Sequence, residues 1–399
     1  MKGIARGIAW GLVWLVAIAA LAAVIAPRFL DRIYYRGVAT DHFDGARFFN
    51  PDGEDTAGPP GRGGRAGFLW RQATGGDGRP AWPETVAVRP ARPAELPGTT
   101  TLPARDPAAT PMRVTWIGHA SVLVQVPGLN ILTDPVWSDR AGPFGFGPRR
   151  VAAPGIALAD LPKIDLILIS HNHYDHLDLA TLRAIWARDR PAIVTSLGND
   201  AILRGAGMDA TALDWRQAAR VGGATVHVVR NHHWGSRWFA DRNRALWSAF
   251  AVDLPGGNLF FAGDTGLGDG GWVREAAALG PYRLALLPIG AFRFQPGQMA
   301  SGAHIGPVDA LGVFHGLGAA RGMAIHWGTF RLSYEGWDTP PRLLRAARAC
   351  APEAAGSRFG TAAIGRPVDI PPMRAVAPTG FDRAAVLACL DTPQVRALR

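Results

Sequence analysis

The sequence is poor in lysine, and this shortage argues against one class of partner. Lys2 and Lys163 are the only lysines, so arginine supplies nearly all of the positive charge behind the formal net charge of +10. The arginines are scattered along the chain and form no long basic block, whereas nucleic-acid-binding proteins gather basic residues into a stripe or patch. We therefore expect that nucleic acid is not a partner.

Cysteine is equally scarce, and its scarcity excludes one kind of metal site. Cys350 and Cys389 are the only cysteines, and no C-x-x-C pair occurs. A zinc site built from thiolates is therefore excluded. One disulfide could join the two residues, but the sequence does not imply it, and the redox compartment stays open.

Long hydrophobic runs are absent except near the N-terminus. Residues 7–26 carry no charge and are rich in Ala, Val, Leu, Ile and Trp, and about 20 apolar residues are enough to span a bilayer as a helix. A cleaved signal peptide is the alternative, but its apolar core is usually shorter, and Pro27 after Ala26 is a poor cleavage context. We predict a single-pass membrane anchor. Arginines flank both of its ends, so the side of the membrane is not predicted.

The remaining chain is suited to a large folded domain, because 48% of the residues are hydrophobic and only 19% are charged. We expect a membrane anchor with its flanks over residues 1–36, a Gly/Pro-rich segment packed on the main domain over 37–111, the main domain over 112–373, and a C-terminal tail over 374–399. Trp70 and Trp82 are expected to attach the second part to the surface. Beyond Met373 we expect no clear contribution to the core, although residues 381–390 could form an amphipathic helix.

Strand-like and helix-like stretches alternate through the main domain. The expected strands are residues 113–118, 121–126, 130–133, 164–170, 192–196, 224–230, 246–253, 258–262, 284–288 and 322–325, and the expected helices are 179–188, 308–317 and 341–350. Such an order indicates an α/β protein in which layered sheets are covered by helices on both outer faces.

One short run carries most of the chemical information. His171-Asn172-His173-Tyr174-Asp175-His176 directly follows a buried strand and precedes a helix, which is a common position for catalytic groups. Imidazole and carboxylate together suit zinc and similar divalent metals. A single histidine on a surface is usually only solvated, but this many ligand-type side chains beside a core would be costly without a metal or other compensation. We therefore predict a metal-dependent enzyme.

Further polar residues lie at the ends of later strands. His232-His233-Trp234, Gly263-Asp264-Thr265 and His326-Trp327-Gly328 each follow an expected strand, and His304 lies in a loop before an expected helix. Each one alone is compatible with a polar residue that merely ends a strand. Their shared placement indicates that they complete the metal site.

These motifs together resemble those of the metallo-β-lactamase fold superfamily. Within it, the chain resembles the branch of N-acyl-phosphatidylethanolamine-hydrolysing phospholipases D. The motifs that carry this second resemblance are Trp116-Ile117-Gly118-His119-Ala120-Ser121, residues 171–178, His233-Trp234, Ala262-Gly263-Asp264-Thr265-Gly266, Pro288-Ile289-Gly290-Ala291 and His326-Trp327-Gly328-Thr329-Phe330. The resemblance implies an αββα four-layer sandwich with a binuclear zinc site at one edge.

The resemblance also implies the roles of individual residues. The first zinc ion would be held by His171, His173 and His233, and the second by Asp175, His176 and His326, with Asp264 bridging the two. His233 is preferred to His232 because it directly precedes Trp234. His304 is the candidate general acid for the leaving group, and a purely structural role for it is equally compatible with the sequence. Asp134 is expected to orient a metal-binding histidine, and His119 either lines the site or packs in the core.

We therefore expect a membrane-tethered, binuclear zinc phosphodiesterase of phospholipase D type that acts on N-acyl-phosphatidylethanolamine or a related phospholipid. Two metals can activate water and clamp the oxygens around phosphorus. The alternative is a metal-dependent hydrolase of a lactone or carboxylic ester, and a non-enzymatic protein with a structural metal is disfavoured because such sites commonly contain cysteine. A homodimer is compatible with the sequence but not indicated by it.

The loop over residues 137–150 is compatible with two interpretations. It contains Trp137, Phe144, Phe146, Arg149 and Arg150, and long loops are often functional. In one interpretation it holds acyl chains and phosphate. In the other it is an ordinary surface loop whose aromatic side chains pack inward.

Overall fold

The computed structural model describes residues 2–54, 79–96, 111–238, 240–294, 302–351, 358–373 and 380–398. Trp70, which we expected to attach the Gly/Pro-rich segment, lies outside the described residues. Trp82 behaves as expected, because its indole Nε1 donates a hydrogen bond to the backbone oxygen of Glu335. The boundaries proposed for the four parts of the chain stay a prediction.

Two seven-stranded sheets form the centre of the structure. The first has the strand order β14-β1-β2-β3-β4-β5-β6, with β1 at Met112–Gly118, β2 at Ser121–Val126, β3 at Leu129–Thr133, β4 at Leu166–Ile169, β5 at Ala192–Ser196, β6 at Thr211–Leu213 and β14 at Pro367–Ile370. The second has the order β13-β12-β11-β10-β9-β8-β7, with β7 at Ala218–Val221, β8 at Ala224–Val229, β9 at Ala249–Asp253, β10 at Asn258–Phe261, β11 at Tyr282–Pro288, β12 at Arg321–Ile325 and β13 at Arg358–Gly360.

Central strands such as β2, β4 and β11 are buried on both faces, which explains why they are almost continuously apolar. In β2, for example, Val122 and Val124 point into the core between the sheets, where they meet Phe250 and Phe261 of the second sheet. Leu123 points the other way, into the core beneath the outer helices. The alternation along one strand therefore serves two separate cores.

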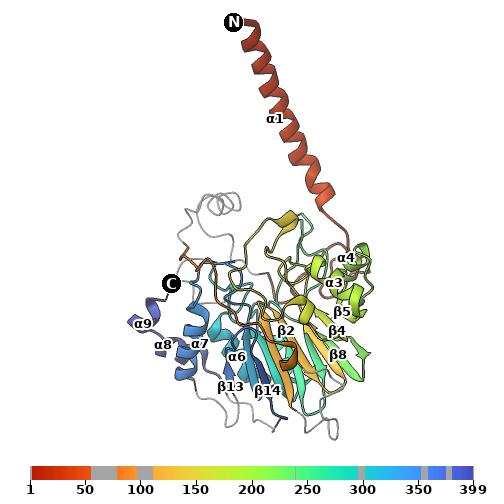
Figure 1. The fold of residues 1–399 in the computed structure, drawn as a ribbon. Helices are drawn as coiled ribbons and strands as arrows, with labels where there is room; N and C mark the ends of the chain where they lie inside the picture. The colour runs from red at the N-terminus through yellow and green to blue at the C-terminus, as the bar shows by residue number, and fades with distance from the viewer. Residues whose placement is uncertain are drawn as a thin grey trace.

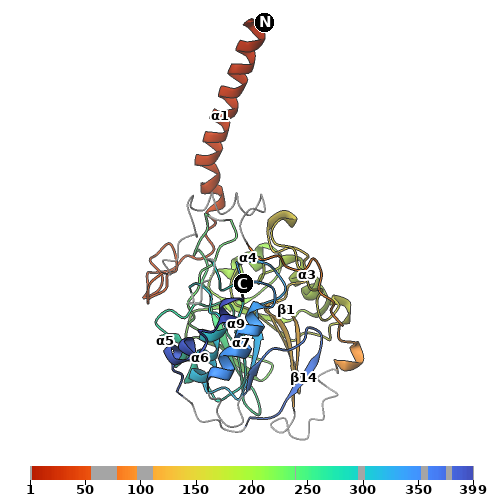
Figure 2. The same ribbon diagram turned by 90° about the vertical axis from the view of Figure 1, so that its left-hand side faces the viewer.

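Helices cover the outer face of each sheet (Figures 1 and 2). The first sheet is covered by α3 (Leu179–Asp189) and α4 (Asn199–Gly205). The second is covered by α5 (Gly271–Ala277), α6 (Pro307–Leu317), α7 (Thr339–Cys350) and α8 (Arg383–Cys389). The expected α/β architecture with two sheets between helical layers is confirmed.

The C-terminal segment corrects one expectation. Val386, Leu390 and Leu398 are buried in the core beneath the outer helices, so the prediction that residues beyond Met373 add little to the core was wrong. Cys350 at the end of α7 forms a disulfide with Cys389 at the end of α8. The contribution of α8 and α9 (Pro393–Arg396) to the core was underestimated. Each of these short helices has few apolar residues, which taken alone do not indicate a buried face.

The N-terminal helix α1 (Lys2–Leu30) projects away from the rest of the molecule (Figure 1). Its segment Arg6–Leu30 is long and apolar enough to cross a membrane and buries none of its surface in the protein. A signal sequence meets the same criteria, so length and composition alone do not separate the two. After the helix, Asp31 pairs with Arg244 at 2.6 Å, and Phe43 and Phe48 are buried in the core between the sheets.

Candidate metal centre

The topology explains why residues distant in sequence meet at one edge. Strands β3, β4 and β5 run parallel in the first sheet, as do β10, β11 and β12 in the second, and parallel strands place their carboxyl ends at the same edge. Within three residues of these ends lie Asp134 after β3, His171 after β4, Asp264 after β10 and His326 after β12. His233 lies in the segment that leaves β8, four residues after the end of that strand.

A first group of ligand atoms belongs to His171, His173, His233 and Asp264, and these atoms all lie within 4.8 Å of one another. His171 Nε2 lies 2.8 Å from His173 Nδ1. His233 Nδ1 lies 2.9 Å from the backbone oxygen of Ala303. Because a carbonyl oxygen can only accept, Nδ1 carries the proton and Nε2 of His233 presents its lone pair to the group.

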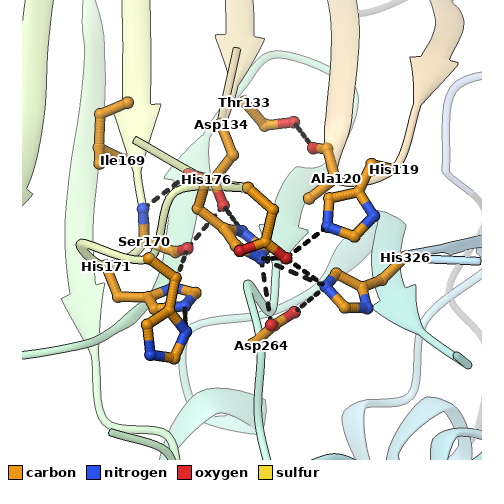
Figure 3. Close-up of polar contacts among 12 residues, drawn as sticks. His119, Ala120, Thr133, Asp134, Ile169, Ser170, His171, His176, Asp264 and His326 are labelled. Carbon is orange, nitrogen blue, oxygen red and sulfur yellow. Dashed lines mark hydrogen bonds and ion pairs between the residues drawn. The ribbon is translucent and has the colours of Figure 1, made fainter. Parts of the chain in front are cut away.

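A second group contains Asp175, His176 and His326, together with His119. His176 Nε2 lies 3.2 Å from His326 Nε2, and both nitrogens lie 3.1 Å from the carboxylate of Asp264, one from each oxygen. Figure 3 shows these side chains pointing toward one another from the ends of different strands. Asp264 therefore stands between the two groups, as a bridging ligand would.

Asp134 fixes the orientation of His176. Its Oδ2 accepts a hydrogen bond from His176 Nδ1 at 2.6 Å, and its two oxygens accept from the backbone N–H and the hydroxyl of Ser170 at 2.8 and 2.6 Å (Figure 3). Because Nδ1 donates to Asp134, Nε2 of His176 is the atom that can give a lone pair to a metal ion. Such a carboxylate–histidine pair is the usual way in which a metal-binding imidazole is held.

His119 joins the second group more closely than the sequence could show. Its Nε2 lies 2.9 Å from Asp175 Oδ2, and its ring lies 3.9 Å from the ring of His326. The backbone N–H of His119 donates to Thr329 Oγ1 at 2.9 Å. The two alternatives left open for His119 are thus resolved in favour of a residue that lines the site. The signal was its position directly after a strand, as for the other site residues.

His304 and His232 have different surroundings. His304 Nδ1 lies 3.7 Å from Asp264 Oδ2, and its ring lies 5.0 Å from the ring of His233, so His304 belongs to the site. His232 instead turns its Nδ1 toward Asp52 at 3.0 Å. Of the adjacent residues His232 and His233, it is therefore His233 that points into the site.

Backbone conformation also concentrates at this edge. His119, Asp134 and His326 all have positive φ values, at 54°, 30° and 61°, which side chains other than glycine rarely adopt and which are often found at functional sites. Gly263 has φ +60°, and a Cβ at this position would lie 2.5 Å from Ser170 Cβ. Glycine before Asp264 thus permits the close approach of the two sheets that brings the two groups together.

The electrostatics of the site favour cation binding. Burial is the main cause that lowers the pKa values of His173, His233 and His304 to about 3, which leaves these imidazoles neutral, the form that binds metals. Burial alone would raise the pKa of Asp264, but attraction to His176 and His326 lowers it well below its usual value.

The two histidines nearest the carboxylates behave in the opposite way. Burial lowers the pKa of His326, but the attraction of Asp264 and hydrogen bonds to Asp175 and Asp264 raise it to about 9. The pKa of His176 is likewise raised well above its usual value, against the effect of burial, by Asp264, Asp175 and Asp134. The carboxylates of Asp134, Asp175 and Asp264 thus favour a positive charge in the centre of the cluster.

The donors fit divalent metals that prefer imidazole and carboxylate ligands. Two sets of such donors converge, they share a carboxylate, and their outward-facing nitrogens are held by Asp134 and by backbone oxygens. All seven predicted ligands are brought together, and their role as ligands stays a proposal.

Arg150 does not support the interpretation in which the loop holds phosphate, because its guanidinium is already bonded within the protein. It is buried and donates to the backbone oxygens of Ser138 at 3.0 Å and Val136 at 2.8 Å, and it stacks over the ring of Phe330 at 5.2 Å. Burial lowers the pKa of Arg150 to about 10, still far above neutral pH. Its function is to hold the start of the loop against the site.

Comparisons with known proteins agree with this geometry. The model of the β-lactamase superfamily domain matches residues 129–327. An N-acyl-phosphatidylethanolamine-hydrolysing phospholipase D of Caenorhabditis elegans is 36% identical over 241 residues, which cover 57% of this chain and 67% of the relative. The chain belongs to the metallo-β-lactamase superfamily. Phospholipases D that hydrolyse N-acyl-phosphatidylethanolamine are among its homologues.

Two further matches extend the picture. An uncharacterised protein of Mycobacterium tuberculosis is 38% identical over 247 residues, covering 60% of this chain and 65% of the relative, so the chain spans slightly less than two thirds of that protein. A solved structure from Veillonella parvula, described as a possible metal-dependent hydrolase, superposes with a TM-score of 0.52 at 15% identity and covers 65% of this chain and 99% of that one. At this identity the second match supports the fold alone.

Proposed function

We propose that the protein is a membrane-tethered, binuclear zinc phosphodiesterase of phospholipase D type, which cleaves N-acyl-phosphatidylethanolamine or a related phospholipid. The observation that carries the proposal is the pair of ligand groups that share Asp264. The substrate class comes from the named relative in Caenorhabditis elegans. The helix α1 supports a membrane location, because it is long and apolar enough to span a bilayer.

In this proposal the two ions are held by the residues of the two groups. One would be bound by His171, His173 and His233, and the other by Asp175, His176 and His326, with Asp264 between them. Bound zinc would supply an activated water molecule and neutralise charge on the phosphoryl oxygens. The protein residues keep the ligands in position: Asp134 directs Nε2 of His176 inward, and backbone oxygens do the same for His233 and His326.

His304 is our candidate for the proton donor to the leaving alkoxide. Burial and the neighbouring His233 and His326 lower its pKa to about 3, although Asp264 acts in the opposite direction. The free enzyme thus holds His304 neutral. An anionic phosphodiester beside the ring would favour the imidazolium, so His304 would take up a proton from water when the substrate binds and transfer it to the leaving alkoxide.

The test uses the detergent-purified full chain, reloaded with zinc, beside its Asp264→Ala variant. Both are incubated with N-acyl-phosphatidylethanolamine, and phosphatidic acid and N-acylethanolamine are measured by mass spectrometry. We expect both products from the unchanged protein and neither from the variant. Asp209→Ala, which alters an exposed carboxylate, is the matched control and should retain activity.

A negative result would be equally specific. If the unchanged protein binds two metal ions per chain and forms neither product, the proposed substrate is wrong. The same preparation would then be compared on lactones and carboxylic esters, the alternative substrate class for this site.

A further inference from the structure

Few large apolar side chains outside α1 are exposed, and most of them lie in two short segments. Among the described residues beyond that helix, five large apolar side chains are exposed: Ile33, Val38, Phe144, Phe146 and Val368. The first two directly follow α1, and the two phenylalanines lie in the loop around the single turn η2 (Pro143–Gly145). Phe144 and Phe146 are 83% and 73% exposed, so neither packs inward as one interpretation of the loop had predicted.

The loop is built to present these two rings outward. Phe146 N donates to Pro143 O at 2.9 Å, and Ala141 N donates to Pro148 O at 3.0 Å, which closes the turn at its base. A Cβ on Gly147 would lie 2.4 Å from the backbone oxygen of Ala141, so glycine is needed for this closure. Two large apolar groups on a tight turn in water are unfavourable, and such a feature usually marks an interaction site.

The turn lies beside the place where α1 leaves the domain. The ring of Phe144 is 5.8 Å from that of Trp238. Trp238 N donates to Asp241 Oδ1 at 2.8 Å, and the other oxygen of Asp241 accepts a hydrogen bond from Tyr34 at 2.8 Å, four residues after the end of α1. In Figures 1 and 2 the dark-yellow turn projects from the same end of the domain as α1.

The segment that contains Trp238 is also hydrogen-bonded to the loop of the metal centre. Arg237, next to Trp238, donates to the backbone oxygens of Asn172, within the ligand loop, at 3.0 Å and of Leu177, directly after it, at 2.9 Å. Its guanidinium lies 3.9 Å from the centre of the Tyr174 ring, within the ligand motif itself. A surface that contacts Phe144 and Trp238 therefore also lies close to the loop that carries His171 to His176.

Charge on the turn matches an anionic surface. Arg140 and Arg149 pair through their backbones at the base of the loop, and both side chains are exposed. Arginine beside exposed aromatic rings is the pattern of membrane interfaces, where rings lie at headgroup depth and cations meet lipid phosphates.

We propose that Phe144 and Phe146 form a second membrane contact, which enters the headgroup boundary of the same bilayer that holds α1. Arg140 and Arg149 contact anionic headgroups on either side. With α1 and this turn both fixed, the domain cannot rotate freely about its anchor, and the ligand loop is held near the lipid surface. The inference rests on the proposed function only in treating α1 as a membrane anchor.

The test places a fluorescent label at defined positions of the full chain. The two native cysteines form a disulfide, so Phe144→Cys or Phe146→Cys introduces a single reactive thiol. Each variant is labelled with an environment-sensitive dye and reconstituted into vesicles of phosphatidylcholine and phosphatidylglycerol, with or without quenchers on the acyl chains. Val38→Cys reports on the region next to α1, and Val368→Cys on β14, at the opposite end of the domain (Figure 1), is the matched distant control.

We expect quenching at Phe144 and Phe146 of roughly twofold or more, because interfacial apolar groups reach about 5–10 Å into the bilayer, and none at Val368. Quenching at Val38 but not at Phe144 and Phe146 would overturn the proposal. Equal quenching at Val368 would also overturn it, because no defined face would then contact lipid.

A kinetic experiment separates this inference from the proposed substrate. The double variant Phe144→Ser with Phe146→Ser should hydrolyse vesicle-bound substrate more slowly and a dispersed short-chain analogue at an unchanged rate. Equal rates on vesicles would contradict the second contact. The fluorescence result does not depend on turnover, so failure of the proposed reaction leaves it fully interpretable.

Discussion

Replacing Asp134 by asparagine tests whether the buried carboxylate controls the second group of ligands. The change keeps the size of the side chain but replaces one acceptor oxygen by an N–H₂ group. With that group facing His176 Nδ1, where the carboxylate now accepts at 2.6 Å, donor would oppose donor. His176 would have to move its proton to Nε2, the nitrogen that lies 3.1 Å from Asp264.

The expected loss of metal affinity follows from the loss of this one hydrogen-bond acceptor. Removing the partner that orients a metal-binding histidine typically weakens metal affinity 10–100-fold, about 1.4–2.7 kcal/mol. We therefore expect one of two zinc ions to be lost to a competing chelator at a concentration roughly 10–100 times lower than in the unchanged protein. The ion associated with the first group should be retained.

The assay is a titration of zinc-loaded protein with a metal-binding indicator, which resolves the two sites without any substrate. Asp165→Asn is the matched control, because Asp165 also accepts a backbone N–H, from Asn130 at 2.9 Å, at the start of a strand away from the site. Circular dichroism checks that both variants fold. If Asp134→Asn folds and binds both ions as tightly as the unchanged protein, the assignment of Asp134 is refuted.

Three further predictions concern stability. Gly263→Ala should lower the unfolding midpoint in urea and weaken metal binding, because its Cβ meets the opposite sheet at 2.5 Å; an unchanged midpoint would contradict this packing. Reduction of the bond between Cys350 and Cys389, 39 residues apart, should cost about 4 kcal/mol of unfolding free energy on the chain-entropy estimate, and Cys350→Ser should match the reduced protein in urea. Burial lowers the pKa of His42, but the carboxylates around it raise it above 6.5 overall. Its contribution to stability is therefore complete below 6.5 and lost as the pH rises through the higher folded-state pKa, and His42→Gln should remove that fall from a series of thermal unfolding curves; a curve that keeps it would exclude His42 as the cause.

Much of the fold could be predicted because its strands are apolar on both faces and end in polar residues. The expected strand at residues 192–196 coincides with β5, and the expected helix at 179–188 differs from α3 by a single residue. Strands at the sheet margins were missed. In β7, for example, Ala218–Val221 is only four residues long and exposed or half-buried throughout, so its apolar pattern is too short to be told from a loop in the sequence.

The members of the site could be named from the sequence, but their precise relations could not. Adjacent histidines show the difference, because only packing decides that His233 turns inward while His232 faces Asp52. The same holds for Arg149 and Arg150, of which one is exposed and the other is buried against Phe330. Neighbours in a chain point in different directions, so a motif identifies the chemistry while the fold selects the side chains that perform it.

The two arginines also explain how one loop serves the site and the proposed membrane contact together. Arg150 holds the base of the loop through backbone oxygens and through Phe330, whose ring meets that of His119 at 5.1 Å. Beyond this fixed base the chain turns outward and exposes Phe144. The loop thus has a base held against the metal centre and a tip exposed to solvent. If the tip contacts a bilayer, as we propose, the length of the loop would set the distance between the ligand groups and the lipid surface, and with it the part of a lipid that reaches the metal centre.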